Sequence, residues 1–429
     1  MMRRWIIIFA ACIAMTSAAG QGLSTITAPS NSPVPPEYFG LIVHSTVVPQ
    51  KRPAGNRLTA WPAVPFGSWR LWDVRVLWPN LEPQRGRWDF SNLDRYVALA
   101  QQHGVEVVLP LAMTPAWASA RPEEKGAYGI GYAAPPKDID DWRVFVRTVA
   151  QRYKGRIKAY ELWNEVNYQR FFSGTPDELV ELARVAFQTI KEVDPSNILT
   201  SPSVVGDRGH LDWFDNYLAR GGKDYADVVA YHFYAPKGPP EAMLPIIARV
   251  RQIVARHGLA ARPLWNTETG WWIKNVTVEP DAGAVEKDWK QLDADHAAAY
   301  VVRAYVVGAA AGLARFHWYA WDNPDMGLVE ASDQALKPAA LAFAAVRNLL
   351  VGSTFNACAL DLGTWTCRLL LADGGPALLA WRAADDTGSM KLPAGWTRVV
   401  AQRVFDGQPY ITADSIQVGM HPVVLRPQR

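Results

Sequence analysis

The chain has 429 residues, about half of them hydrophobic, so it is long enough for one large core and a small second domain. Its 44 basic and 41 acidic residues leave a net charge of only +3, and without a long basic run this argues against nucleic acid as a partner. The 19 tryptophans and 15 tyrosines are the compositional anomaly, because flat rings with a polar edge suit the faces of sugars as well as cores.

The first twenty residues have the features of an export signal. Arginines at positions 3 and 4 precede an apolar run over residues 5–15, and small residues follow it. The run is too short to cross a bilayer, so we expect cleavage near Ala19 and no membrane span. Cys12 leaves a lipoprotein signal as an alternative. The protein is therefore expected to be exported, either periplasmic or secreted.

After an extended lead-in over residues 21–37, strand-like apolar runs alternate with helix-like runs up to residue 350. The predicted strands cover residues 38–43, 67–72, 105–111, 158–163, 198–201, 228–232, 264–268 and 315–319. The main predicted helices cover residues 91–104, 138–153, 176–194, 211–220, 240–257, 293–311 and 338–350. This order predicts an α/β fold, a (β/α)8 TIM barrel over residues 38–350. The Gly- and Pro-rich loop 119–137 lies on the side of its active site.

From residue 351 to 429 the helical period disappears. Short strands are predicted at 364–371, 377–381, 397–404 and 421–425, separated by Gly, Pro and Asp turns. They indicate a small C-terminal antiparallel β-sandwich domain, with part of the lead-in pairing against it. We expect this domain to support the barrel, and independent sugar binding is the alternative. Once the signal is removed, Cys358 and Cys367 remain, and we expect a disulfide across a hairpin. Two reduced, buried thiols are the alternative.

Two of the predicted barrel strands end on a glutamate. The fourth runs into Trp163-Asn164-Glu165 and the seventh into Thr267-Glu268. A carboxylate at the end of a buried strand is costly and needs a reason. The glutamates are 268 − 165 = 103 residues apart, which leaves room for three strand–helix units, so both face the mouth at the C-terminal ends of the strands. The pair indicates the acid/base and nucleophile of a retaining glycosidase.

The motif Glu161-Leu162-Trp163-Asn164-Glu165, with Tyr231-His232-Phe233-Tyr234 and Thr267-Glu268-Thr269-Gly270-Trp271, resembles the clan of retaining (β/α)8 glycosidases. Within that clan it is most similar to glycoside hydrolase family 39, and there to bacterial members that process exopolysaccharides. The resemblance covers roughly residues 38–350. Val166 departs from it, because many relatives carry proline there. The resemblance implies Glu165 as general acid/base and Glu268 as nucleophile.

Other residues are assigned around this pair. Arg70, at the end of the second strand, is the candidate cation that keeps Glu268 ionised, with a surface salt bridge as the alternative. In relatives the residue at Asn164 hydrogen-bonds the sugar 2-hydroxyl, although strand alternation would point it away from Glu165. Tyr234 is the candidate hydrogen-bond donor to Glu268.

The floor of the −1 subsite, where the scissile sugar sits, is assigned to His232 and His44. A core position is the alternative for His44. Glu161 should point into the barrel and pair with a cation. In relatives a tryptophan at the end of strand eight stacks under the sugar, which assigns Trp318 to that role. Weaker aromatic candidates for further subsites are Trp117, Trp271, Trp272 and Trp321, and a core position is the alternative for each of them.

No cluster of His, Cys or Asp has the spacing of metal ligands, and no Gly-rich phosphate loop or Gly-x-Ser-x-Gly elbow is present, so we expect neither metal nor cofactor. We predict a monomeric retaining β-glycosidase, endo-acting on a bacterial exopolysaccharide, with a polysaccharide or oligosaccharide as its partner. A xylanase or xylosidase that acts on plant polymers is one alternative. A non-catalytic polysaccharide-binding protein that keeps the barrel is the other.

Overall fold

The structure is a computed structural model that describes residues 24–27, 32–49, 57–207, 209–276 and 289–428. The predicted export signal lies outside the described residues, so it stays a prediction. In the part of the chain that is described, no helix is long and apolar enough to cross a membrane.

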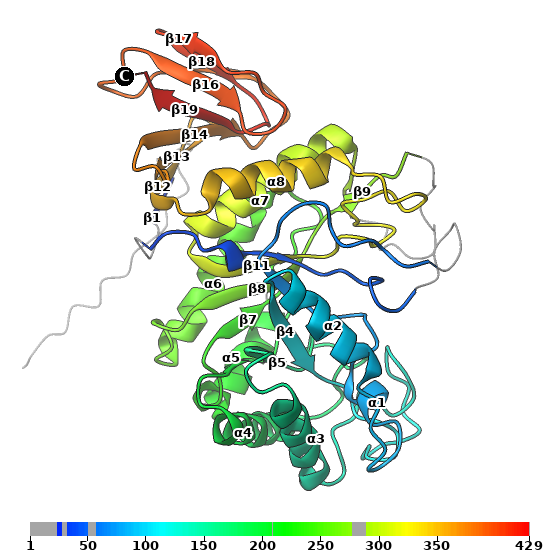
Figure 1. Ribbon diagram of the computed structural model, residues 1–429. Coiled ribbons are helices and arrows are strands. Elements are labelled where there is room, and N and C mark those ends of the chain that lie inside the picture. The colour runs from blue at the N-terminus through cyan, green and yellow to red at the C-terminus, as the bar shows by residue number, and fades with distance from the viewer. Residues whose placement is uncertain (1–23, 28–31, 50–56, 208, 277–288, 429) are drawn as a thin grey trace, which may run out of the picture.

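Eight parallel strands form one curved sheet at the centre of the molecule (Figure 1). They are β2 (Phe39–Leu41), β3 (Ser68–Arg70), β4 (Glu106–Leu111), β5 (Ala159–Leu162), β6 (Ile198–Thr200), β7 (Val229–Tyr231), β8 (Leu264–Thr269) and β11 (Leu313–Trp318). Their spatial order is β6-β5-β4-β3-β2-β11-β8-β7. Single parallel bridges, Thr200 to Val228 and Val205 to His232, join the two outer strands, so the sheet is nearly closed. The predicted barrel is confirmed.

Helices surround this sheet. They are α2 (Ser91–Gln102), α3 (Ile139–Arg152), α4 (Pro176–Val193), α5 (Gly209–Ala219), α6 (Met243–Arg256), α7 (Ala294–Ala310) and α8 (Pro338–Leu350). The start of α4 shows how the sequence fixes a boundary, because Thr175 and Glu178 form a reciprocal capping box around Pro176. The sequence predicts no helix between the first two strands, and among the described residues between β2 and β3 none is helical; α1 (Trp78–Leu81) is a single turn after β3.

The C-terminal domain is an antiparallel sheet of seven strands with a two-stranded ribbon beside it. The sheet contains β1 (Ser24–Thr27), β12 (Thr354–Asp361), β13 (Thr364–Leu370), β14 (Pro376–Arg382), β16 (Val399–Arg403), β17 (Tyr410–Thr412) and β19 (Val423–Pro427). The ribbon pairs β15 (Gly388–Lys391) with β18 (Ser415–Val418). The predicted C-terminal antiparallel β domain is confirmed, and β1 of the lead-in does pair with it, along β12.

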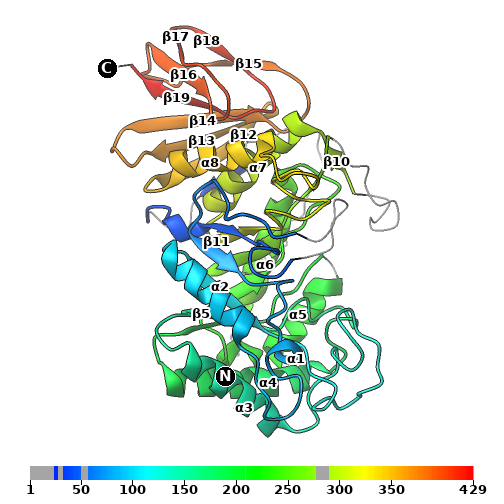
Figure 2. The ribbon, with the colours of Figure 1, turned by 45° about the vertical axis from the view of Figure 1, so that its right-hand side comes forward.

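This domain lies over α7 and α8 in both views (Figures 1 and 2). Glu241, in the short helix η3 (Pro240–Ala242), accepts hydrogen bonds from Arg303 of α7 at 2.9 Å and from Trp381 of β14 at 2.6 Å, which ties the two domains together. Cys358 and Cys367 form the expected disulfide and stand opposite each other on the β12–β13 hairpin.

Candidate active site

The chain leaves β5 through two residues in the left-handed region, Trp163 at φ 57° and Glu165 at φ 45°. Non-glycine residues rarely adopt this conformation, and it breaks the alternation of side chains along a strand. As a result Asn164 and Glu165 both contact groups in the barrel mouth, whereas the strand pattern had predicted opposite directions. Trp163 is buried instead, and its indole N–H donates to the carbonyl of Phe171 at 2.7 Å.

Arg70, at the end of β3, organises the floor of the mouth. Its guanidinium donates to both oxygens of Glu161, at 2.6 and 3.2 Å, and to Oδ1 of Asn164 at 2.7 Å. Its remaining nitrogen, Nη1, donates to Oε2 of Glu268 at 2.8 Å. Arg70 and Glu161 are fully buried, so the surface salt bridge is excluded for Arg70, and Glu161 has the cation that was expected for it.

Glu268, near the end of β8, has both oxygens engaged. While Arg70 holds Oε2, the phenol of Tyr234 donates to Oε1 at 2.8 Å. This is the contact that the sequence predicted for Tyr234. Two donors on one carboxylate favour its ionised form and fix its orientation.

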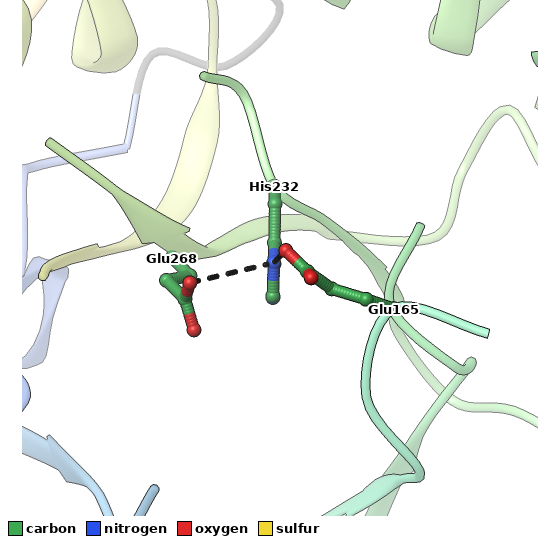
Figure 3. A group of neighbouring side chains, drawn as sticks. All are labelled: Glu165, His232 and Glu268. Carbon is green, nitrogen blue, oxygen red and sulfur yellow. Dashed lines mark hydrogen bonds and ion pairs between the residues drawn. The ribbon is translucent and has the colours of Figure 1, made fainter. Parts of the chain in front are cut away.

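Glu165 and Glu268 face each other across His232 (Figure 3). Nδ1 of His232 is 3.0 Å from Oε1 of Glu165 and 3.9 Å from Oε1 of Glu268. The nearest atoms of all three side chains lie within 4.8 Å of one another. Retaining glycosidases hold their two carboxyl groups about 5–5.5 Å apart, whereas inverting enzymes separate them by about 6.5–9.5 Å to admit a water molecule. The geometry is therefore that of a retaining pair.

The two carboxyl groups differ in their electrostatic surroundings. Burial raises the pKa of Glu165 from 4.5 to about 7, and the attraction of Arg70 only partly opposes this. Burial also raises the pKa of Glu268, although electrostatic interactions with His232 and Arg70 lower it. Because Arg70 touches Glu268 directly, Glu268 is the carboxyl that ionises first. Burial lowers the pKa of His232 to about 4, so its imidazole is neutral at pH 7.

One histidine and two carboxylates also have the composition of a metal site, and among the described residues Glu165, His232 and Glu268 form such a group. Arg70 and Tyr234, however, already occupy both oxygens of Glu268, and a guanidinium supplies the positive charge that a metal would bring. The arrangement suits acid/base and nucleophilic chemistry better than metal binding, and a metal-free site stays a prediction.

Three of the expected sugar platforms lie in the core instead. Trp318 is fully buried and donates its indole N–H to the carbonyl of Met326, while Trp271 is fully buried beside it, with ring centroids 5.8 Å apart. Trp321 is 2% exposed. A ring covered by protein on both faces offers no surface to a sugar, so the assignment of these tryptophans to subsites is wrong.

Two other tryptophans assigned to subsites do not contact the catalytic pair. Trp117 is half-buried in a groove lined also by Asp141, and the guanidinium of Arg85 covers its ring at 4.9 Å. Trp272 is half-buried in β9 (Trp272–Ile273). Neither contacts Glu165 or Glu268 in the described structure, so a sugar-binding role for either stays a prediction.

His44 lies at the edge of the mouth and is 3% exposed, with one ring nitrogen 3.9 Å from Asp73 and the other 3.9 Å from Asp322. The sequence reasoning missed the group around it. Tyr319, one residue beyond Trp318, is partly exposed and donates to Asp73 at 2.8 Å, and Tyr128 donates to the other oxygen of Asp73 at 2.5 Å. The one available signal was the long loop 119–137, which carries Tyr128.

A nearly closed parallel barrel whose mouth holds two facing glutamates, one with its pKa raised by burial and one paired with arginine, defines the architecture and the site of a retaining glycosidase. Residues 67–303, more than half of the chain, match the family model described as "Glycosyl hydrolases family 39". The chain belongs to this family, whose members are retaining O-glycosyl hydrolases.

Individual relatives are distant. A beta-xylosidase of Geobacillus stearothermophilus is 26% identical over 207 residues, which are 42% of this chain but only 40% of that protein. A family 39 glycoside hydrolase structure from Bacteroides cellulosilyticus WH2 has a TM-score of 0.68 at 18% identity, covering 93% of this chain and 81% of the other. A monomeric beta-xylosidase structure from Caulobacter crescentus CB15 has a TM-score of 0.61 at 15% identity, covering 94% and 98%. At these identities the structures establish the fold.

Proposed function

We propose that this protein is a retaining glycoside hydrolase that cleaves β-glycosidic bonds by double displacement. Glu165 is the general acid/base and Glu268 the nucleophile. One observation carries the proposal: the two carboxyl groups approach within 4.8 Å, and Glu268 is bonded to Arg70 while burial raises the pKa of Glu165 to about 7.

In the first step the ionised Glu268 attacks the anomeric carbon of the sugar. The proton of Glu165 passes to the departing glycosidic oxygen, because the raised pKa keeps that proton in place at the start. The products of this step are the free leaving group and an ester between Glu268 and the sugar.

In the second step Glu165, now ionised, takes a proton from water, and the water attacks the anomeric carbon and releases Glu268. Two inversions give net retention. His232, neutral and buried, holds one oxygen of Glu165 in place throughout. Arg70 fixes Oδ1 of Asn164, which leaves the amide N–H group of Asn164 to donate to a sugar hydroxyl, the role implied for it by the family.

The first candidate substrate is a bacterial exopolysaccharide, supported by the family resemblance and by the predicted export signal. Support for endo action came from aromatic residues at the mouth, and the burial of Trp271, Trp318 and Trp321 removes it. Glu165 and Glu268 are 9% and 7% exposed, so both lie deep in the barrel mouth, a burial that suits endo and exo action equally. The second candidate substrate is a β-xyloside, favoured by the beta-xylosidase of Geobacillus stearothermophilus.

The test measures new reducing ends released from the host exopolysaccharide and, separately, from xylo-oligosaccharides. The wild type is compared with Glu268→Ala and with Glu192→Gln, a matched control at an exposed carboxylate of α4. We expect release by the wild type and the control only, and the substrate that is cleaved identifies the class. If all three proteins bind the polymer and none releases new reducing ends, the result would support the non-catalytic polysaccharide-binding alternative.

A further inference from the structure

A groove of about 650 Å³ lies at the junction of the two domains, where the β domain meets the first turn of α7. We refer to it as the junction groove. Its lining includes His296 of α7, Asp386 and Thr387 before β15, Tyr410 of β17, Gln417 of β18 and His421 before β19. Neither Glu165 nor Glu268 lines it. The volume is in the range of clefts that bind small ligands, so the groove is large enough for sugar units.

The junction groove lies at the same end of the barrel as the catalytic pair. Because α7 follows β8 and runs back antiparallel to it, the first turn of α7 is at the end of the barrel that carries Glu268. Tyr234, which donates to Glu268, packs its ring against Trp289 with centroids 5.6 Å apart. The next residue, Lys290, lies 4.0 Å from Asp385 of the groove lining. A long polymer bound in the mouth can therefore extend along the surface to the junction groove.

The charged side chains of the groove lining already face groups of opposite charge or a histidine ring. The pairs are Asp386 with Arg382 at 2.6 Å, Asp385 with His296 at 3.4 Å, His421 with Asp295 at 2.9 Å and Arg403 with Asp406 at 3.3 Å. An acidic sugar would compete with a carboxylate for each of these cationic or imidazole groups, and it would also meet the carboxylates of Asp385 and Asp386. The charge pattern therefore favours an uncharged ligand.

The lining also presents uncharged groups to solvent. Tyr410, in the edge strand β17, is 46% exposed, and Thr387 and Gln417 are exposed as well. In the part of the chain that the structure describes, the side-chain polar groups of these three residues have no hydrogen-bond partner. An aromatic ring that can stack, together with a hydroxyl and an amide that both donate and accept, matches the apolar face and the hydroxyl groups of a neutral sugar.

We propose that the junction groove is a second carbohydrate-binding site, which holds a neutral segment of a polysaccharide while another segment of the same chain occupies the catalytic pocket. Tyr410 stacks against a sugar ring there, and Thr387 and Gln417 bind its hydroxyl groups. The inference rests on the proposed glycosidase function for the identity of the ligand as a substrate, and it gives the β domain a role besides supporting the barrel.

The first test measures binding by native electrophoresis in gels that contain soluble xylan, mixed-linkage β-glucan or alginate, which are two neutral polymers and one acidic polymer. The background protein is Glu268→Ala, which lacks the nucleophile, and Tyr410→Ala is compared in it with Ile411→Ala. Ile411 is the matched control, because it is 51% exposed on the same strand but points to the other face and does not line the groove. Neither substitution changes the charge, so mobilities without polymer should agree, and melting curves check folding.

We expect at least one neutral polymer to retard the background protein, and alginate to retard it far less. Tyr410→Ala should weaken the affinity for the neutral polymer by roughly 10-fold, because a stacked ring and its buried area are lost, whereas Ile411→Ala should leave it unchanged. Retardation of Tyr410→Ala equal to that of the background protein overturns the site. Equal or stronger retardation by alginate, or no retardation by any of the three polymers, overturns it too.

A kinetic measurement tests the link to the catalytic pocket with Glu268 intact. Tyr410→Ala should raise the KM for the neutral polymer by about 10-fold relative to the KM for an aryl β-glycoside of the same sugar, which is too small to reach both sites. An unchanged ratio on a polymer that is cleaved overturns the link. Polymer binding that depends on Tyr410, without cleavage by the wild type, contradicts the hydrolase proposal and supports the junction groove, so the two failures are distinguishable.

Discussion

The barrel buries two arginine–glutamate pairs that look alike and do different things. On the floor of the mouth, Arg70 grips both oxygens of Glu161 at 2.6 and 3.2 Å. At the junction with the C-terminal domain, Arg303 grips both oxygens of Glu241 at 2.9 and 2.5 Å. Both guanidinium groups are fully buried, so each needs its carboxylate to offset the cost of losing water.

The difference lies in the hydrogen bonds beyond each pair. At the junction they lead into the β domain: Trp381 donates to Glu241, and Arg303 donates to the carbonyl of Ala383 at 3.2 Å. On the floor they lead to Glu268 and Asn164, which face the pocket. A buried ion pair is therefore no sign of catalysis by itself. The role of such a pair depends on where the arginine's remaining N–H groups donate: into the packed interior, as at the junction, or to residues of the active site, as on the floor of the mouth.

The largest expected effect is on kcat, and it distinguishes the nucleophile Glu268 from Glu241, the carboxylate at the domain junction. Glu268→Ala should lower kcat by about four orders of magnitude or more, because covalent catalysis is lost, while the folded fraction of Glu241→Ala should keep a near-normal kcat. Initial rates, corrected for the folded fraction from melting curves, check this. Comparable losses of kcat in the two variants would break the distinction between site and junction.

The second prediction concerns the arginines themselves. Lysine keeps the charge but not the two-pronged geometry, so Arg70→Lys and Arg303→Lys should each destabilise the fold by about 3 kcal/mol. Arg70→Lys should also lower kcat by about 100-fold, because Glu268 loses its oriented donor. Denaturant titration with kinetics well below the melting temperature separates the two effects. A loss of kcat in Arg303→Lys would show that the junction reaches the site.

The third prediction concerns how the stability of the wild type and of a Glu165 variant depends on pH. The pKa of Glu165 is raised from 4.5 to about 7, so the folded state binds its proton more tightly than the unfolded state, and stability is lost as pH rises across that window. Glu165→Gln removes this loss. The inactive variant should be more stable than the wild type by about 3 kcal/mol at pH 8 and equal to it at pH 4. Unfolding curves at both pH values test it, and a stability difference that does not change with pH contradicts the shift.

The smallest effect is expected far from the pocket. Cys358 and Cys367 are nine positions apart and already opposite each other on a hairpin, so their disulfide constrains the unfolded chain only modestly. The double variant Cys358→Ser/Cys367→Ser should lose about 1 kcal/mol of stability with an unchanged kcat. Thermal unfolding shows whether this holds. An unchanged melting temperature would count against a stabilising role for the bridge.

The sequence predicted the elements whose periodicity is strong. The boundaries of α3 and α8, the glutamates after β5 and in β8, and the contacts of Arg70 and Tyr234 all follow from strand ends that converge on one mouth. Prediction of side-chain positions from the sequence failed at strand ends and in loops, where the backbone is no longer regular. Trp318 and Tyr319 are adjacent, and a shift of one residue exchanges a core side chain for one at the mouth.

The same limit applies to the rest of the pocket wall. The position of Asp73 depends on its left-handed backbone, and that of Tyr128 depends on the path of a long loop. Neither has a periodic pattern that a sequence could reveal, because loop conformation is set by contacts between distant segments.

The most direct test of the account is the anomeric form of the first product, followed by proton NMR while the wild type cleaves a β-glycoside. Two carboxyl groups within 4.8 Å leave no room for a water molecule between Glu268 and the sugar, so the initial product should be the β-anomer, with the α-anomer appearing later by mutarotation. An initial α-anomer would mean inversion and would contradict the assignment of Glu268 as nucleophile.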